Sequence, residues 1–306
     1  MSKPLIIVAV VLLSWAGSSR LQAQDTAKGA ALLAEARQAV GGEARLAAVK
    51  TLDVRGDFKR LAGQTTIQGE LHVRIERPDK WRRDEDLSPP GGGPAIIRTE
   101  VLNGSAVWEE NAGRGFFIGG FGRGGGGRGG GFGGGGGFGG GVDAGRGAAI
   151  DPAQVEATQR RAWQAELARF LLAWLLTAEG PVAWVGTAQA PDGQADVLEI
   201  TPSAGPVTRL FLDQTSHLPL MITWQGVAPQ FVVAGRRGGR GDAGPPSAAR
   251  GGQPTTLQIT LAEYMTVNGI RLPHLITRGA NDLTTEEWTI ERYRINPNFG
   301  ADVFNR

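Results

Sequence analysis

The longest apolar pattern with helical spacing runs through residues 151–178. It begins at Asp151 and Pro152, an N-cap residue followed by a first-turn proline, and Gly180-Pro181 marks its expected end. Within it, five large apolar side chains recur every three or four positions. We call them the apolar stripe: Trp163, Leu167, Phe170, Leu171 and Trp174. A helix with this much apolar surface needs another element to cover it.

On both sides of this helix the spacing of apolar residues changes to a period of two. Residues 70–76 and 257–261 alternate between apolar and polar side chains, as half-buried strands do. Asn-Gly pairs at 103–104 and 268–269 are typical of tight hairpins. The pattern therefore predicts strands that are connected by short turns.

The order of these elements predicts the fold class. Consecutive hairpins favour antiparallel pairing, and helices on one side of such a sheet give an α+β fold. We expect a strongly curved antiparallel sheet with an N-terminal helix over 26–40, and the central helix covering the concave face. Trp224 and Trp288 should lie in strands of this one sheet. Neither half of the chain covers its own apolar faces, so residues 24–306 should form a single domain.

The N-terminus has the pattern of a secretory signal over residues 1–23. Lys3 supplies the positive start, residues 5–13 the apolar core, and Ala23 ends a small-residue cleavage site. The alternative is an uncleaved N-terminal anchor. We expect an exported, periplasmic protein of the bacterial envelope. The chain has no cysteine, which excludes disulfides, thiolate metal sites and an acylated lipoprotein cysteine.

Two Gly/Arg-rich segments, 113–149 and 235–254, interrupt the periodic patterns. They have too few aliphatic residues to offset chain entropy, and we expect disordered loops there. The formal net charge of +2 falls to zero once Lys3 and Arg20 leave with the signal, so no overall field attracts nucleic acid. The Arg-Gly repeats resemble RNA-binding segments, but export argues against a nucleic-acid partner.

Deleting residues 119–141 is expected to change the melting temperature little. The closure entropy of a long loop grows only slowly with its length, and no core side chain is removed. Differential scanning calorimetry of the parent and the deletion variant measures the difference. Loss of a cooperative transition in the variant would contradict the loop assignment.

Catalytic and metal-binding motifs are absent from the sequence. It contains no G-x-S-x-G, no H-E-x-x-H and no cysteine nucleophile. His72, His217 and His274 lie far apart without metal-ligand spacing, and the acidic run at 84–86 is interpreted as a solvated strand end. We expect no metal ion, no cofactor and no enzymatic activity, with catalysis by dispersed residues as the alternative. His274 is a candidate for the rim of a cavity, with a hydrogen-bonded core histidine as the alternative.

Four segments carry a resemblance in layout to a known superfamily. They are LLAEARQAVGGEARLAAVKTLDVRGDF, FLDQTSHLPLMITW, EYMTVNGIRLPHLIT and EEWTIERYRINPNFGADVF. Together they resemble the LolA/LolB-like superfamily of exported lipoprotein carriers and lipoprotein-sorting proteins, over most of the chain after the signal. The resemblance implies an unclosed, curved β-barrel with helices over its mouth and an apolar cavity that holds acyl chains. The Gly/Arg-rich segments depart from the family, and no functional residue transfers.

These patterns lead to one expected function and two alternatives. We expect a monomeric binding or carrier protein that shields a hydrophobic ligand, such as a lipid, an acyl chain or a lipoprotein, under a helical lid. The apolar stripe would then border the ligand; the alternative is that it only fills the core. An envelope sensor that binds a protein partner is the second reading, and an enzyme the third. Peripheral contact with a membrane is a further mode that the sequence allows.

Overall fold

The computed structural model describes most of the chain. The described residues are 18–62, 65–88, 96–112, 151–190, 193–202, 205–227, 254–281 and 283–306. Residues 1–17 of the expected signal, the whole of 113–149 and residues 235–253 lie outside the described residues. What the sequence predicts for them stays a prediction.

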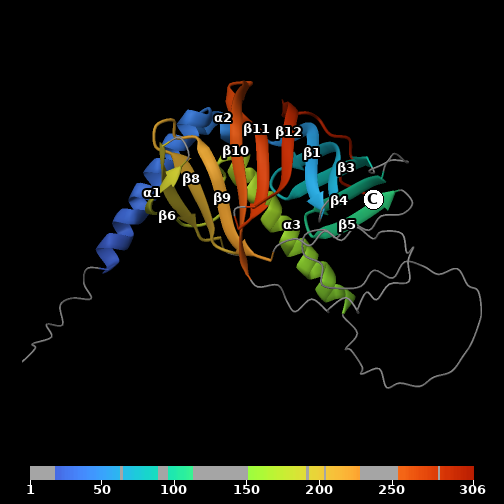
Figure 1. Ribbon diagram of the computed structural model, residues 1–306, viewed down its shortest axis with the longest axis horizontal. Helices are drawn as coiled ribbons and strands as arrows, with labels where there is room; N and C mark the ends of the chain where they lie inside the picture. The colour runs from blue at the N-terminus through green and yellow to red at the C-terminus, as the bar shows by residue number, and fades with distance from the viewer. Residues whose placement is uncertain are drawn as a thin grey trace, which may run out of the picture.

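In the described part of the chain, twelve strands form one sheet in which every neighbouring pair is antiparallel. They are β1 (Thr51–Ala62), β2 (Thr65–Glu76), β3 (Lys80–Ser88), β4 (Ile96–Asn103), β5 (Ala106–Ala112), β6 (Val182–Ala190), β7 (Gly193–Ile200), β8 (Thr208–Asp213), β9 (Pro219–Gly226), β10 (Thr255–Val267), β11 (Ile270–Ala280) and β12 (Leu283–Ile295). Their order is β5-β4-β3-β2-β1-β12-β11-β10-β9-β8-β7-β6. The edge strands β5 and β6 do not pair with each other, so the curved sheet stays open (Figure 1). The predicted α+β fold is confirmed.

The turn predictions are confirmed as well. Val267 pairs with Ile270 across the turn of Asn268 and Gly269, which both have positive φ, 49° and 78°. Such a turn matches the right-handed twist of the flanking strands. Asn103 pairs with Ala106 at the other predicted hairpin tip. Trp224 in β9 and Trp288 in β12 lie in the same sheet, as expected.

Helix α1 (Ser18–Val40) packs beside the edge strand β6, and the short α2 (Glu43–Ala48) follows it (Figure 1). The close approach depends on Gly29, where an added Cβ would lie 2.8 Å from the carbonyl carbon of Ala183. The ammonium of Lys28 lies 3.2 Å from the ring centroid of Trp184. Covering an edge strand in this way protects its backbone from pairing with another chain.

Helix α3 (Pro152–Leu175) crosses the concave side of the sheet (Figure 1). Its start is as predicted, because the Asp151 carboxylate accepts a hydrogen bond from the Ala153 amide at 3.0 Å. Its end is not. The helix stops at Leu175, before Gly180-Pro181, because Leu176 adopts a left-handed conformation with φ 50°. The Leu176 carbonyl accepts hydrogen bonds from Nε and Nη2 of Arg37 in α1, at 3.2 and 3.1 Å.

The core lies between α3 and the concave face. Its largest fully buried apolar side chains come from both sides: Trp81, Trp174, Trp288, Phe58 and Phe170. The side chains that alternate with them on the strands point to the convex, solvated face. Among the described residues, no helix is both long and apolar enough to cross a membrane.

Candidate functional site

The apolar stripe of α3 is buried against the concave face of the sheet. Its five residues are each 6% exposed or less. The Phe170 ring stacks on Trp174 with centroids 4.9 Å apart, and on Trp288 of β12 at 5.3 Å. Trp163 meets Trp81 of β3 edge-on at 5.9 Å. The stripe therefore fills the space between α3 and the sheet, and its contact with a ligand stays a prediction.

His274 is half-buried on β11, near the C-terminal end of the stripe. Its Nδ1 lies 2.7 Å from the carbonyl oxygen of Ile290, so that nitrogen carries the proton and donates. The other ring nitrogen, Nε2, is buried and makes no hydrogen bond within the described part of the chain. The ring packs edge-on against Tyr293 at 5.2 Å. A hydrogen-bonded histidine beside the core agrees with one of the two readings of the sequence; its place on a cavity rim stays a prediction.

The concave face also carries a group of buried charges, which the sequence analysis missed. We call it the ion cluster: Arg60 of β1, Arg83 and Glu85 of β3, Arg278 of β11, Glu286 of β12, and Glu166 of α3. The pattern contained a signal for it, because each strand member stands two positions from an apolar residue of the concave face. The run 84–86 is thus not entirely a solvated strand end, since Glu85 is buried.

Arg60 lies at the centre of the ion cluster and joins β12, which pairs with β1, to β3, which lies on the far side of β2. Its Nη1 and Nη2 donate to the Glu85 carboxylate at 3.0 and 2.6 Å. Its Nη2 and Nε donate to Glu286 at 2.9 and 3.2 Å. Arg83 donates to Glu286 at 2.9 Å and also pairs with Glu85. These forked hydrogen bonds are the geometry in which a guanidinium compensates buried carboxylates most fully.

Helix α3 contributes one carboxylate to the ion cluster. Glu166 Oε1 lies 2.6 Å from Nη2 of Arg278, and its Oε2 accepts a hydrogen bond at 3.0 Å from Arg169, one turn along the helix. The Arg169 guanidinium lies 4.3 Å from the ring centroid of Trp224 in β9. The middle of α3 is therefore attached to the sheet by charge as well as by apolar packing.

The charges in the ion cluster perturb each other's pKa values. Burial by itself would raise the pKa of Glu286, but the positive charges of Arg60, Arg83 and Arg278 outweigh it and lower this pKa to about 2. The same balance lowers the pKa of Glu85 and of Glu166. All three carboxylates are thus ionised at neutral pH. A carboxylate that is charged and fully paired has no proton to exchange, which is unlike a general acid.

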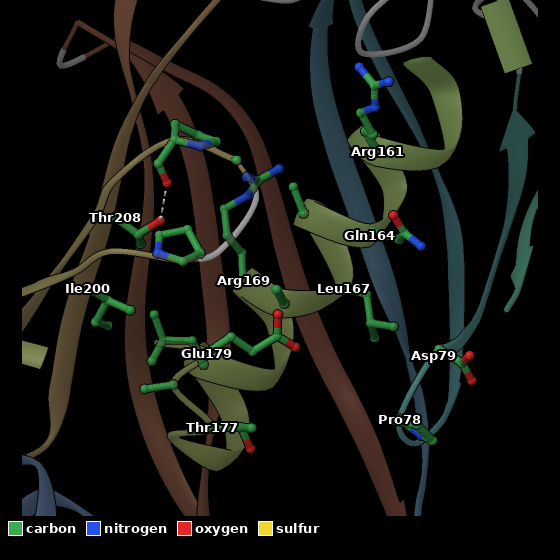
Figure 2. Close-up of a pocket in the computed structure, with 17 residues that line it drawn as sticks. Pro78, Asp79, Arg161, Gln164, Leu167, Arg169, Thr177, Glu179, Ile200 and Thr208 are labelled. Carbon is green, nitrogen blue, oxygen red and sulfur yellow. Dashed lines mark hydrogen bonds between the residues drawn. The ribbon is translucent and has the colours of Figure 1, made fainter. Parts of the chain in front are cut away.

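A groove of about 400 Å³ lies along the outer flank of α3 (Figure 2). Leu167, Ala168 and Leu172 of the helix line one wall of it. The opposite wall includes Ile200 of β7 and Thr208 of β8. Charged side chains also reach the groove: Arg161, Arg169, Asp79 and Glu179. Leu167 belongs to both the groove and the buried stripe, so the groove borders the core directly.

The described residues offer no further site with recognisable chemistry. Among them, no three His, Cys, Asp or Glu side chains are close enough together to hold a metal ion. The arrangement on the concave face is that of a covered apolar surface with a charged patch at one end.

Comparisons with known proteins give matches among solved structures. No protein-family model matches the chain, and no curated protein matches its sequence. A LolA superfamily protein from Nitrosomonas europaea aligns with a TM-score of 0.45 and 11% identity, over 91% of this chain and 97% of that one. A lipoprotein-sorting protein domain from Vibrio parahaemolyticus aligns with a TM-score of 0.44 and 12% identity, over 92% and 97% of the two chains. A DUF1329 family protein from Desulfovibrio piger aligns with a TM-score of 0.42 and 7% identity, over 90% and 96%.

Proposed function

We propose that this chain is an exported, periplasmic binding protein that shields a hydrophobic ligand, with α3 as a movable cover. The observation that carries the proposal is the way α3 closes the concave face. It is attached there by side-chain contacts, and a groove of about 400 Å³ separates its outer flank from β7 and β8. Displacing α3 would expose the floor of the sheet, where an acyl chain could replace the buried stripe.

Replacing α3 by an acyl chain exchanges one apolar covering of the sheet for another, so the two free energies of burial are similar. Removing apolar area from water stabilises by about 25 cal/mol per Å², whether the partner is a helix or an acyl chain. A ligand therefore needs to replace only the contacts that α3 gives up. The attachments that α3 would lose are the stacking of Phe170 on Trp288, the ion pair of Glu166 with Arg278, and the contact of Arg37 with Leu176.

The groove provides the path by which a ligand would reach the floor. Leu167 and Leu172 line the groove, and both are also buried in the core. An outward shift of α3 would therefore join the groove to the interior without unfolding a strand.

The test uses the absence of cysteine, which makes introduced cysteines unique labelling sites. Spin labels at Gln164→Cys on α3 and Lys59→Cys on β1 report the distance between helix and sheet. A fluorescent fatty acid should bind to the labelled protein, and its binding should lengthen this distance. The distance between labels at Lys59→Cys and Thr266→Cys, which both lie on the sheet, should not change. Absence of binding by the parent protein would refute the proposal, and binding without movement would refute the cover.

A protein-binding envelope role is the second candidate, and the filled interior favours it. Every residue of the apolar stripe is buried against the sheet, so the concave face already has an occupant. In this role α3 would be a fixed core helix, and the partner would bind elsewhere. A capture experiment from an envelope extract that returns one stoichiometric protein, together with no fatty-acid binding, would support this alternative.

A further inference from the structure

The geometry at Arg278 points to the class of ligand: we propose an amphiphile whose anionic headgroup, a carboxylate or a phosphate, binds Arg278 in the place now taken by Glu166. The inference rests on the proposed function, because it concerns the state in which α3 is displaced. The inference places the polar end of the ligand at Arg278, in a site that is otherwise apolar.

Arg278 is an unusual residue to find on the floor of an apolar site. Its side chain is 2% exposed and stands on the concave face of β11, two positions from the fully buried Ile276. Its guanidinium carbon lies 5.7 Å from the ring centroid of Phe170 and 5.5 Å from that of Trp288. A guanidinium in such surroundings needs a carboxylate or phosphate, because an uncompensated buried charge is strongly destabilising.

One carboxylate that Arg278 pairs with comes from the cover. Glu166 of α3 lies 2.6 Å from its Nη2. Glu286 of the sheet also interacts with the charge of Arg278, but it already accepts hydrogen bonds from Arg60, Arg83 and the indole of Trp288. When α3 leaves, the other pairs of the ion cluster stay within the sheet, but the pair of Arg278 with Glu166 is broken. An anionic headgroup would restore it.

In this interpretation, side chains of α3 occupy the positions that the headgroup and the alkyl chain of the ligand would take. Glu166, Phe170 and Trp174 stand at intervals of four residues, so a carboxylate is followed along one helix face by two aromatic rings. The distance from first to last is about 12 Å at the rise of an α-helix. The ligand would therefore lie with its headgroup at Arg278 and its alkyl chain running toward Tyr293 and the end of α3. The planar fork of arginine suits a carboxylate and a phosphate equally well.

The experiment compares ligands that differ only in their headgroup. A neutral naphthylamine dye bound to the full chain is displaced by dodecanoate, dodecyl phosphate or dodecanol, each below its micelle concentration. The parent should bind the two anions about tenfold more tightly than the alcohol, which is the usual effect of a charged hydrogen bond. Tighter binding of the phosphate than of the carboxylate would indicate a phospholipid-type headgroup, and the reverse a free fatty acid.

Two variants break the same ion pair but should differ in their preference for the anion over the alcohol. Glu166→Gln loosens α3, so the affinities for anion and alcohol should rise by one common factor, with the preference for the anion unchanged. Arg278→Gln loosens α3 as well, but it removes the anion site, so the preference should fall to about one. Arg278→Lys keeps the charge and should keep a preference. Arg37→Gln frees the far end of α3 and is the control for loosening alone.

The outcomes separate this inference from the function on which it rests. Equal affinity of the parent for dodecanoate and dodecanol, with the dye bound, would overturn the headgroup assignment and leave the binding function standing. A preference that survives in Arg278→Gln would overturn it too. No binding of dye or competitor would refute both proposals. Equal affinities of the parent would by themselves overturn the assignment, so the proposal can be refuted even if Arg278→Gln does not fold.

Discussion

Phe170→Ala is expected to lower the free energy of unfolding by about 3–5 kcal/mol, the usual cost of truncating a fully buried aromatic ring. The ring of Phe170 is completely buried and stacks on Trp174 and on Trp288, so its removal leaves a cavity between α3 and β12. The surrounding indoles are too large and too well fixed to collapse into that space. Urea unfolding followed by circular dichroism measures the difference.

Leu283→Ala is the control for this variant. Leu283 is 72% exposed at the start of β12, so its truncation should change the free energy of unfolding by less than about 0.5 kcal/mol. An equally small effect of Phe170→Ala would mean that α3 is not packed on the sheet. Fatty-acid binding by the same variants separates the two proposed functions. A large loss of stability together with no binding by the parent would exclude the carrier.

The regular features of this fold were predictable because their signals are local. Alternation with a period of two and the Asn-Gly turn at 268–269 specify a hairpin within a few residues of sequence. The apolar stripe required a large covering surface, and an antiparallel sheet was the structure available to supply it. By contrast, the pairing of β1 with β12 joins the first described strand to the last, and no local pattern encodes it.

The end of α3 shows how tertiary contacts override a local stop signal. Gly180-Pro181 was predicted to end the helix, yet the chain leaves it at Leu176, a residue with little intrinsic preference for positive φ. The buried side chain of Leu176 and the two hydrogen bonds from Arg37 hold this conformation. Arg37 lies in α1, far from Leu176 in the sequence, so the local pattern around residue 176 could not predict this contact.

The ion cluster was missed because a charge on a strand is normally interpreted as solvated. Glu85 stands in an acidic run, and only its alternation with Trp81 and Leu87 places it on the concave face. A buried carboxylate is tolerated only with its counter-ions, and here these are Arg60 of β1 and the neighbouring Arg83. Recognising the cluster from sequence would have required the strand register, which pairs Arg60 with Glu286 across β1 and β12.

Glu286→Gln is expected to lower the free energy of unfolding at neutral pH by about 3–5 kcal/mol, because removing one member of a buried ion pair leaves the others uncompensated. The carboxylate accepts hydrogen bonds from Arg60, Arg83 and the indole of Trp288, and a neutral amide cannot balance the two guanidinium charges. Glu287→Gln is the matched control on the next residue. That side chain is 39% exposed on the convex face and pairs with Lys59 at 3.7 Å, so its change should cost less than about 1 kcal/mol.

The pH dependence of the unfolding free energy is a second, independent test of the role of Glu286. The pKa of Glu286 is about 2 in the folded protein, below the value of about 4.3 that a glutamate has in an unfolded chain. A carboxyl with a lowered folded pKa contributes stability that is fully present above the unfolded pKa and is lost as the pH falls through the folded one. The difference in unfolding free energy between the parent and Glu286→Gln should therefore be constant near neutrality and shrink from about pH 4 toward about pH 2. A difference that is independent of pH over this range would show that the stabilising interaction of Glu286 does not depend on its charge.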